Sequence, residues 1–352
     1  MISANNIIIL VFANITISFI SLYYLKDIFL NKKLINLRIN NRHGERWGDS
    51  EKSHVGGIAI SGNIIFTNIY LFFFLNQFYI LNLNKIFYFS IIVLISGIFG
   101  YFDEKFNLRA MNKLCLQILI AIFLILNNKI INFSSITAFN VIFSIIIFVY
   151  FFNVINMFDN IDLGLTSVSL SSVIFMMIYF KTLPEITPYL IITFSFLIIF
   201  AYFNKFPSKI FMGDIGSFQL SVIFIGLIIE CYWNNFEFTG YIHSIYYLLL
   251  SFMIFSVPIY DFFLVTSRRV YLKKNIFIGD TNHFSHMLNS KLKNPNYVAI
   301  TIFIITFIFG FSSIFIDKYS EGSLKVNLIQ LIIILLIKFL IMTLLYYKMI
   351  KK

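Results

Sequence analysis

The stretch VIFSIIIFVYFF at residues 141–152 runs directly into NVINMFDNIDLGLTS at residues 153–167. The first part carries no charge and a single serine, so no side of it is suited to water. The second part places asparagines and acids at the end of that apolar run. The pattern predicts a helix embedded in a membrane that brings polar groups to the membrane surface, where such groups are usually functional.

The composition of the whole chain supports a membrane protein. Of 352 residues, 59% are apolar and 12% are charged, about half the charged share of a soluble domain. Disorder is excluded, because it requires low hydrophobicity and high charge. The net charge of +11 would suggest nucleic acid in a soluble protein, whereas in a membrane protein it reports loop topology, so no nucleic-acid partner is expected.

Hydropathy predicts an all-α, polytopic integral membrane protein with about eleven transmembrane helices in a single domain, residues 1–352. A helix needs about 20 residues to cross the hydrocarbon core. The expected spans are 5–25, 55–75, 86–102, 112–126, 136–152, 163–180, 189–203, 216–233, 244–262, 296–316 and 327–347. The motif-bearing connecting segments are 26–54, 103–113, 153–164, 204–217 and 263–295.

The distribution of basic residues predicts the orientation. Most of the 27 Lys and Arg residues lie in the motif-bearing segments and the C-terminal tail. The other side holds only Lys85, Lys129, Lys181, Lys318 and Lys325. By the positive-inside rule the motif-bearing side is cytoplasmic, with the N-terminus outside and the C-terminus inside. Lys338 is the exception, a basic residue inside the last span.

Acidic residues gather at the cytoplasmic helix ends, and Asp103, Asp159 and Asp214 each begin or interrupt a helix. Carboxylates partly withdrawn from water are costly and usually functional. Carboxyl and amide oxygens that converge from several helices suit a hard cation such as Mg²⁺, with Mn²⁺ as the alternative. Nearby Lys and Arg residues suit a phosphate substrate.

Segment 103–113 reads DEKFNLRAMNK. Adjacent acids on a helix point about 100° apart, so Asp103 and Glu104 can take different roles. Asn107 lies one turn after Asp103, and Lys113 lies one turn after Arg109, where the two cations could hold phosphate. Snorkelling at a helix end would explain the cations but not the acid pair.

Segment 153–167 spaces four polar residues by three: Asn153, Asn156, Asp159 and Asp162. On a helix this spacing places them along one face. A lone Asn in a membrane helix more often forms a hydrogen bond between helices, but four polar residues on one face favour a functional site.

Two further segments complete the set. In NKFPSKIFMGDIGS (204–217), Gly213 and Gly216 free the backbone around Asp214, which predicts an anion cradle at a helix N-terminus, with a simple helix cap as the alternative. In GDTNHFSHML (279–288), His283 and His286 share a helical face. Zinc is one reading of that pair, but without cysteine we favour histidines facing a diphosphate.

Together these segments, in this order, resemble the polyprenyl-phosphate N-acetylhexosamine-1-phosphate transferase family (glycosyltransferase family 4). The resemblance implies that Asp214 is a metal ligand, with Asn156 as the second. It implies catalytic roles for a set of five residues, Asp103, Glu104, Asp159, Asp162 and His283. The implied substrate-binding residues are Asn107, Lys113, Asn204, Phe211 and His286, with Asn204 and Phe211 near the uracil.

The chain also departs from the family pattern. Glu104 replaces the usual second Asp, and Leu163 stands where many members have Gly. The run of three His in the peptidoglycan lipid-I synthase is replaced by HFSH (283–286), which argues against a peptidoglycan-precursor substrate, although a phospho-MurNAc-pentapeptide transferase stays an alternative within the family.

The resemblance implies an Mg²⁺-dependent enzyme that moves N-acetylhexosamine 1-phosphate, by default GlcNAc 1-phosphate, from a UDP-sugar to undecaprenyl phosphate with release of UMP. We expect the protein to lie in the bacterial inner membrane, in contact with membrane lipid. We expect its product to enter cell-envelope polysaccharide synthesis, such as that of lipopolysaccharide. A homodimer is one option for the oligomeric state. The rival readings are a secondary transporter and a non-catalytic scaffold that retained the fold.

Overall fold

A computed structural model describes residues 4–32, 54, 56–75, 83–179, 186–233, 240–274, 283–319 and 323–350. The helices are α1 (Ala4–Lys32), α2 (Gly56–Leu75), α3 (Leu83–Phe106), α4 (Ala110–Leu126), α5 (Thr137–Phe158), α6 (Gly164–Tyr179), α7 (Thr187–Asn204), α8 (Gly213–Ile228), the π-helical turn η1 (Ile229–Trp233), α9 (Tyr241–Ile254), α10 (Ser256–Tyr271), α11 (Phe284–Leu292), α12 (Pro295–Tyr319) and α13 (Leu324–Ile350). Most of segment 26–54 and part of segment 263–295 lie outside the described residues.

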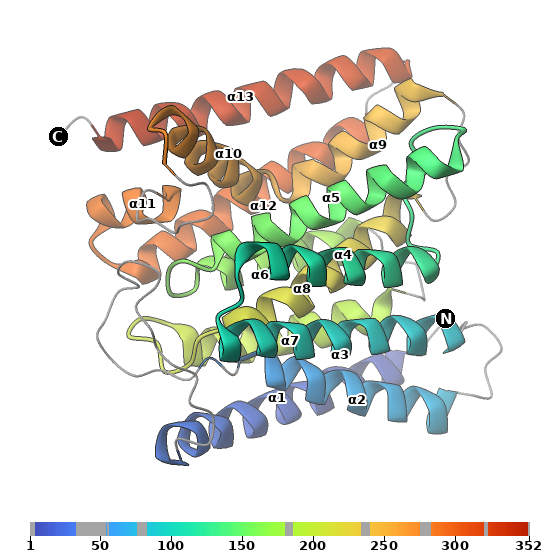
Figure 1. The fold of residues 1–352 in the computed structure, drawn as a ribbon, viewed down its shortest axis with the longest axis vertical. Helices are drawn as coiled ribbons and strands as arrows, with labels where there is room; N and C mark the ends of the chain where they lie inside the picture. Colours follow the sequence, from blue (N-terminus) through green and yellow to red (C-terminus); the bar gives the residue numbers. More distant parts are fainter. Residues whose placement is uncertain are drawn as a thin grey trace.

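The expected helical membrane fold is confirmed. Within the described ranges, eight helices are long and apolar enough to cross a membrane, and the bent pair α9–α10 makes a ninth. The other two expected spans are the shorter apolar helices α4 and α6. The chain is therefore a polytopic membrane protein whose helices run side by side, as Figure 1 shows.

The two ends of the chain lie at opposite ends of this bundle (Figure 1). That arrangement agrees with a chain that begins on one side of a membrane and ends on the other. Which side is cytoplasmic remains a prediction from the basic residues.

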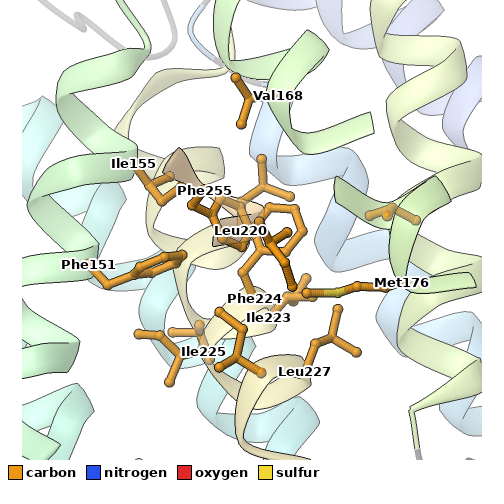
Figure 2. Close-up of a cluster of buried hydrophobic side chains, with 14 of the residues drawn as sticks. Phe151, Ile155, Val168, Met176, Leu220, Ile223, Phe224, Ile225, Leu227 and Phe255 are labelled. Carbon is orange, nitrogen blue, oxygen red and sulfur yellow. The ribbon is translucent and has the colours of Figure 1, made fainter. Parts of the chain in front are cut away.

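Helix α8 forms the centre of the bundle. It packs against α2, α3 and α5, and 89% of its most apolar stretch is buried. Leu220, Ile223 and Phe224 point into a cluster that also holds Phe151 of α5 and Phe255 beside α9 (Figure 2). Because α8 is covered on every side, its N-terminal residues have a fixed place relative to the surrounding helices.

The expected span 244–262 is not one straight helix. The chain turns by 89° between α9 and α10, at Phe255. Pro258 explains the break, because it has no N–H to donate to the carbonyl of Ile254, and its ring hinders a continuous helix. The turn carries Asp261 away from the direction of α9, and α10 continues through residues expected to form a loop.

Two buried basic residues lie away from the polar end of the bundle. Lys129, beyond the C-terminus of α4, forms an ion pair with Glu230 of η1. Lys338 of α13 is 3% exposed, donates to the backbone oxygen of Phe309 (2.6 Å) and contacts the sulfur of Met253 (2.9 Å). Each cation is buried with a partner that offsets part of the cost of leaving water.

Candidate active site

Four helix ends meet at one end of the bundle and bring the predicted acids together. Asp103 lies near the end of α3, Lys113 in the first turn of α4, Asn156 near the end of α5, and Asp214 at the start of α8. These segments are far apart in sequence. Their convergence is the arrangement that the sequence predicted.

Lys113 lies between two carboxylates. Its Nζ forms an ion pair with Asp103 and lies 3.5 Å from Oδ2 of Asp214. Asp103 is 6% exposed, whereas Asp214 is more open at 27%. Two negative charges around one positive charge leave an excess negative charge in a poorly hydrated place, which favours a further cation.

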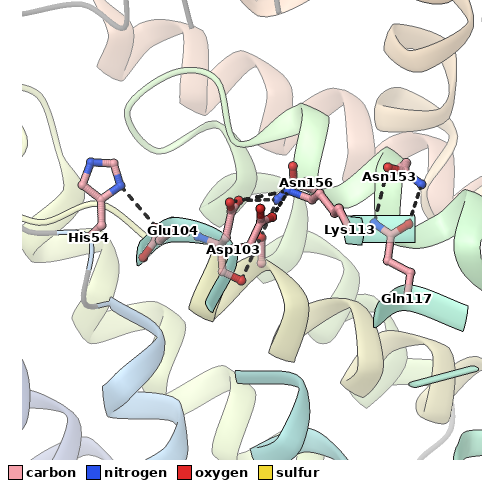
Figure 3. Close-up of polar contacts among 9 residues, drawn as sticks. His54, Asp103, Glu104, Lys113, Gln117, Asn153 and Asn156 are labelled. Carbon is pink, nitrogen blue, oxygen red and sulfur yellow. Dashed lines mark hydrogen bonds and ion pairs between the residues drawn. The ribbon is translucent and has the colours of Figure 1, made fainter. Parts of the chain in front are cut away.

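Asn156 ties α5 to the start of α8. Its Nδ2 donates to Oδ1 of Asp214 (2.6 Å) and to the hydroxyl of Ser217 (2.9 Å). One turn earlier, Asn153 exchanges hydrogen bonds with Gln117 of α4 (3.0 and 3.4 Å). Figure 3 shows these contacts as a row of polar side chains across the site.

Glu104 occupies the N-terminus of α8. Its Oε1 accepts from the backbone N–H of Asp214 (2.8 Å) and lies 3.4 Å from Nδ1 of His54. A carboxylate at this position is stabilised by the partial positive charge of the helix end. At the helix N-terminus where we expected an anion cradle, the backbone N–H of Asp214 is thus taken by a side chain of α3.

Glycines allow α2 and α3 to pack closely against the start of α8. A Cβ at Gly100 of α3 would lie 2.6 Å from the carbonyl carbon of Asp214, and one at Gly57 of α2 would lie 2.6 Å from Cα of Gly216. Gly213 has a φ of +72°, and a Cβ there would lie 2.7 Å from the backbone oxygen of His54. Close backbone packing against α2 and α3 thus holds the start of α8 together with the side-chain contacts of Asn156 and Glu104.

The predicted stripe of four polar residues is wrong beyond Asn156. Helix α5 ends at Phe158, and Asp159 leaves the helix with φ −77° and ψ 57°. Asp162 lies after the turn, where it accepts from the backbone N–H (3.2 Å) and hydroxyl (2.9 Å) of Ser208. Helical spacing does not survive the end of a helix, so the four residues do not share a face.

Asn204 braces the segment beside Asp162. Its Oδ1 accepts from the backbone N–H of Leu163 (2.9 Å) and its Nδ2 donates to the carbonyl of Ile210 (2.9 Å). Leu163, where many family members have Gly, has a φ of +63°, a conformation that glycine tolerates best. The amide of Asn204 therefore orders the turns at Leu163 and Ile210.

The other expected binding residues surround the cluster. Phe211 precedes α8, its ring centroid lies 5.2 Å from that of His54, and its carbonyl accepts from the N–H of Gly56 (3.1 Å). Asn107 lies just beyond α3 with a φ of +46°, and Arg109 precedes α4 with an exposed side chain. The side chain of Lys113, by contrast, is engaged with both Asp103 and Asp214.

His283 directly precedes α11, and His286 lies in its first turn. His283 is 5% exposed, and its Nδ1 lies 2.7 Å from Oδ2 of Asp261 in α10. The ring of His286 lies 5.9 Å from that of His283, centroid to centroid. Ser285 hydrogen-bonds Asn160, which connects α11 to the loop that follows Asn156.

Several residues outside the predicted site set contact its members: His54, Gln117, Ser208, Ser217 and Asp261. Gln117 lies one helical turn after Lys113, a spacing that could have indicated a shared face. The partners of Glu104 and His283 carry no such local signal, because each comes from a separate helix.

The donor set suits a hard cation. No group of three or more His, Cys, Asp or Glu side chains close enough to hold a metal lies in the described ranges. Mg²⁺ commonly takes one or two carboxylates and completes its shell with substrate phosphates and water, so such a group is not required. Oε2 of Glu104 is buried without a hydrogen-bond partner, and the carboxylate of Asp214 is partly open.

Comparison with known proteins supports the resemblance. Residues 86–232 match the model of glycosyl transferase family 4, a range that contains Asp103, Lys113, Asn156 and Asp214. The chain is 28% identical over 231 residues to the probable undecaprenyl-phosphate N-acetylglucosaminyl 1-phosphate transferase of Bacillus subtilis (strain 168), covering 62% of each chain.

Two further relatives carry another name. The phospho-N-acetylmuramoyl-pentapeptide-transferase of Dictyoglomus turgidum is 28% identical over 194 residues, 49% of this chain and 59% of that protein. The protein of that name from Lactobacillus helveticus is 32% identical over 162 residues, 40% of this chain and 50% of that protein. The chain thus spans less than two thirds of the length of each of these relatives.

Proposed function

Because residues 86–232 match the model of glycosyl transferase family 4, we propose that the chain transfers N-acetylhexosamine 1-phosphate from a UDP-sugar to undecaprenyl phosphate and releases UMP. The sugar is GlcNAc by default, after the name of the Bacillus subtilis relative. The product would be a polyprenyl-diphosphate sugar that begins cell-envelope polysaccharide synthesis.

One observation carries this proposal: Asp103, Lys113 and Asp214 converge at the end of a membrane-embedded bundle. Phosphoryl transfer between anions depends mainly on positioning and on neutralising charge. A site at the end of the bundle can receive a water-soluble nucleotide sugar from one side and a lipid phosphate from the other. The transporter reading fits less well, because transporters place ionisable groups near the membrane midplane.

The residues divide the work as follows. Lys113 is released from one carboxylate to hold the diphosphate of the donor. Asp103 orients the lipid phosphate or takes its remaining acidic proton. An oxygen of that phosphate then bonds to the sugar-bound phosphorus, and the bond from this phosphorus to the bridging oxygen breaks. That oxygen leaves on UMP with the bonding electron pair.

The residues that would hold Mg²⁺, or Mn²⁺ in its place, are Asp214 and Asn156. Rotation of the Asn156 amide would present its oxygen instead of its nitrogen beside Oδ1 of Asp214. When bound, the ion would neutralise charge on the diphosphate and on the departing UMP. Direct attack by the lipid phosphate needs no covalent enzyme intermediate, so trapping an aspartyl-phosphate would contradict this mechanism.

The distribution of basic residues also indicates where in the cell the site lies. The basic residues on the motif-bearing side favour a site on the cytoplasmic face of the bacterial inner membrane.

Purified protein incubated with undecaprenyl phosphate, Mg²⁺ and a panel of UDP-sugars tests the proposal. We expect UMP release and, by mass spectrometry, a lipid diphosphate sugar, both lost in Asp103→Asn and Asp214→Asn. The panel includes UDP-N-acetylmuramoyl-pentapeptide, because two relatives carry the name of that transferase. Solute flux in proteoliposomes without any UMP would support a transporter and refute the transferase.

A further inference from the structure

We infer that Asp261 is a positioning residue for His283: it holds the proton on Nδ1 and thereby directs Nε2 toward the substrate. The inference rests on the proposed function for its catalytic consequence. The geometry that carries it is independent of that function. Asp261 is 1% exposed, and its two carboxylate oxygens have different partners, both at the start of α11.

One oxygen of Asp261 is committed to the backbone. Oδ1 accepts from the N–H of Phe284, the first residue of α11, at 2.6 Å. A backbone N–H is always a donor, so this oxygen is always an acceptor. The contact fixes the position of the carboxylate relative to the helix end.

The other oxygen then determines the state of the histidine. Oδ2 lies 2.7 Å from Nδ1 of His283. A carboxylate only accepts, so Nδ1 must carry the proton in both the neutral and the protonated ring. Nε2 is left to face a ligand, as an acceptor in the neutral ring and as a donor in the protonated one.

The fold explains how this carboxylate reaches the histidine. The 89° turn between α9 and α10, at Phe255, redirects the chain less than two helical turns before Asp261. The hydrogen bond between Ser285 and Asn160 fixes the other side of α11 against the loop after Asn156. His283 is thus held between α10 and the end of α5 that supplies the candidate metal ligand.

The replacement Asp261→Asn separates positioning from simple capping. The carboxamide has one acceptor, which the N–H of Phe284 occupies. Its NH₂ group then faces Nδ1, and the ring must move its proton to Nε2. The cap on α11 stays, so the protein should fold, while the orientation of the imidazole dipole reverses.

The first measurement is the tautomer itself. The chain has five histidines, so ¹⁵N-histidine labelling gives few signals, and His283→Gln identifies the one of interest. We expect a proton on Nδ1 in the unaltered protein and its loss in Asp261→Asn. An unprotonated Nδ1 in the unaltered protein would overturn the inference, whatever reaction the protein performs.

The second measurement is turnover in the transferase assay. Asp261→Asn should lower kcat about 10²-fold with little change in KM for the UDP-sugar, the range for one group that hydrogen-bonds the charge developing on the diphosphate. It should cause no further loss in a His283→Gln background, because its effect passes through that ring. Asp261→Glu should recover part of the activity.

The control is Asp317→Asn, which alters a carboxylate that accepts from the hydroxyl of Tyr246 (2.9 Å) outside the site. It should retain full kcat. Additive losses in the double variant, or equal losses in the control, would show a merely structural role for Asp261. If the unaltered protein makes no lipid product from any UDP-sugar, the proposed function fails, and the tautomer measurement still decides the pairing.

Discussion

Replacing Gly100 by Ala tests whether backbone packing positions Asp214. The new Cβ would lie 2.6 Å from the carbonyl carbon of Asp214 and 2.7 Å from Cα of Ile215, whereas ordinary contact begins at 3.4 Å. The carbonyl oxygen of Asp214 lies closer still, so the start of α8 must move by about 1 Å, since neither helix backbone can yield locally. That movement changes the position of Asp214 relative to Asp103 and to Asn156.

The size of the effect follows from this displacement. A misplacement of about 1 Å in a positioned site can cost about 10²-fold in rate. We expect Gly100→Ala to lose between about 10- and 100-fold in UMP release, measured on purified protein at saturating substrates. The variant should still insert and purify, because the apolar surface is unchanged.

The matched control is Gly62→Ala on α2. The nearest atom to a Cβ there is Cγ2 of Ile17 at 3.8 Å, an ordinary contact. Its turnover should stay within twofold of the unaltered protein. Full activity in Gly100→Ala, or a similar loss in Gly62→Ala, would refute the argument that glycine packing sets the site.

Three further outcomes are expected. Lys113→Met leaves two carboxylates without their shared ammonium and should lower UMP release about 10²- to 10³-fold. Lys113→Arg should recover part of the activity. Turnover of Lys113→Met within twofold of the unaltered protein would contradict the role of Lys113. Leu163→Gly relieves a left-handed backbone strain of about 1 kcal/mol and should maintain or raise the Tm. The control Leu165→Gly, at a buried site in α6, should lower the Tm. A lower Tm for Leu163→Gly would count against strain. Lys129→Met removes the partner of Glu230 and should reduce the free energy of unfolding by about 3 kcal/mol. The double variant Lys129→Met/Glu230→Leu should recover most of that stability. An unchanged Tm in the single variant would exclude a stabilising pair.

The sequence was sufficient to predict the helical spans and the end of the bundle at which polar residues meet. Apolar length and the clustering of acids are local properties, so Asp103, Asn156 and Asp214 could each be found in their own segments. Their convergence followed from placing every motif on one side of the membrane. The partner of each residue could not be predicted, because it depends on how helices are ordered around α8.

Hydropathy also failed to identify the central helix. Helix α13 has a higher mean hydropathy than α8, yet only 17% of its most apolar stretch is buried, against 89% for α8. Lipid is as apolar as a protein core, so the most apolar helix has no reason to be inside. Small and polar residues such as Gly216, Ser217 and Gln219 were the better signal, because they permit close packing and interhelical hydrogen bonds.

The break of the polar stripe after Asn156 has a similar origin. Spacing by three predicts a shared face only while the helix continues, and no residue at 157 or 158 is a strong helix breaker. The end of α5 is determined by its surroundings, where Asp162 and Asn204 satisfy groups of the following turns. Tertiary contacts thus overrode the local periodicity.

The placement of Lys338 has a consequence for biogenesis. An isolated α13 would expose this ammonium to hydrocarbon, at a cost of about 3 kcal/mol for a lysine at a helix centre. Phe309 of α12 and Met253 of α9 emerge from the ribosome earlier and supply its contacts. Helix α13 therefore gains by leaving the translocon onto an already assembled partner surface, which makes its integration cooperative with the preceding spans.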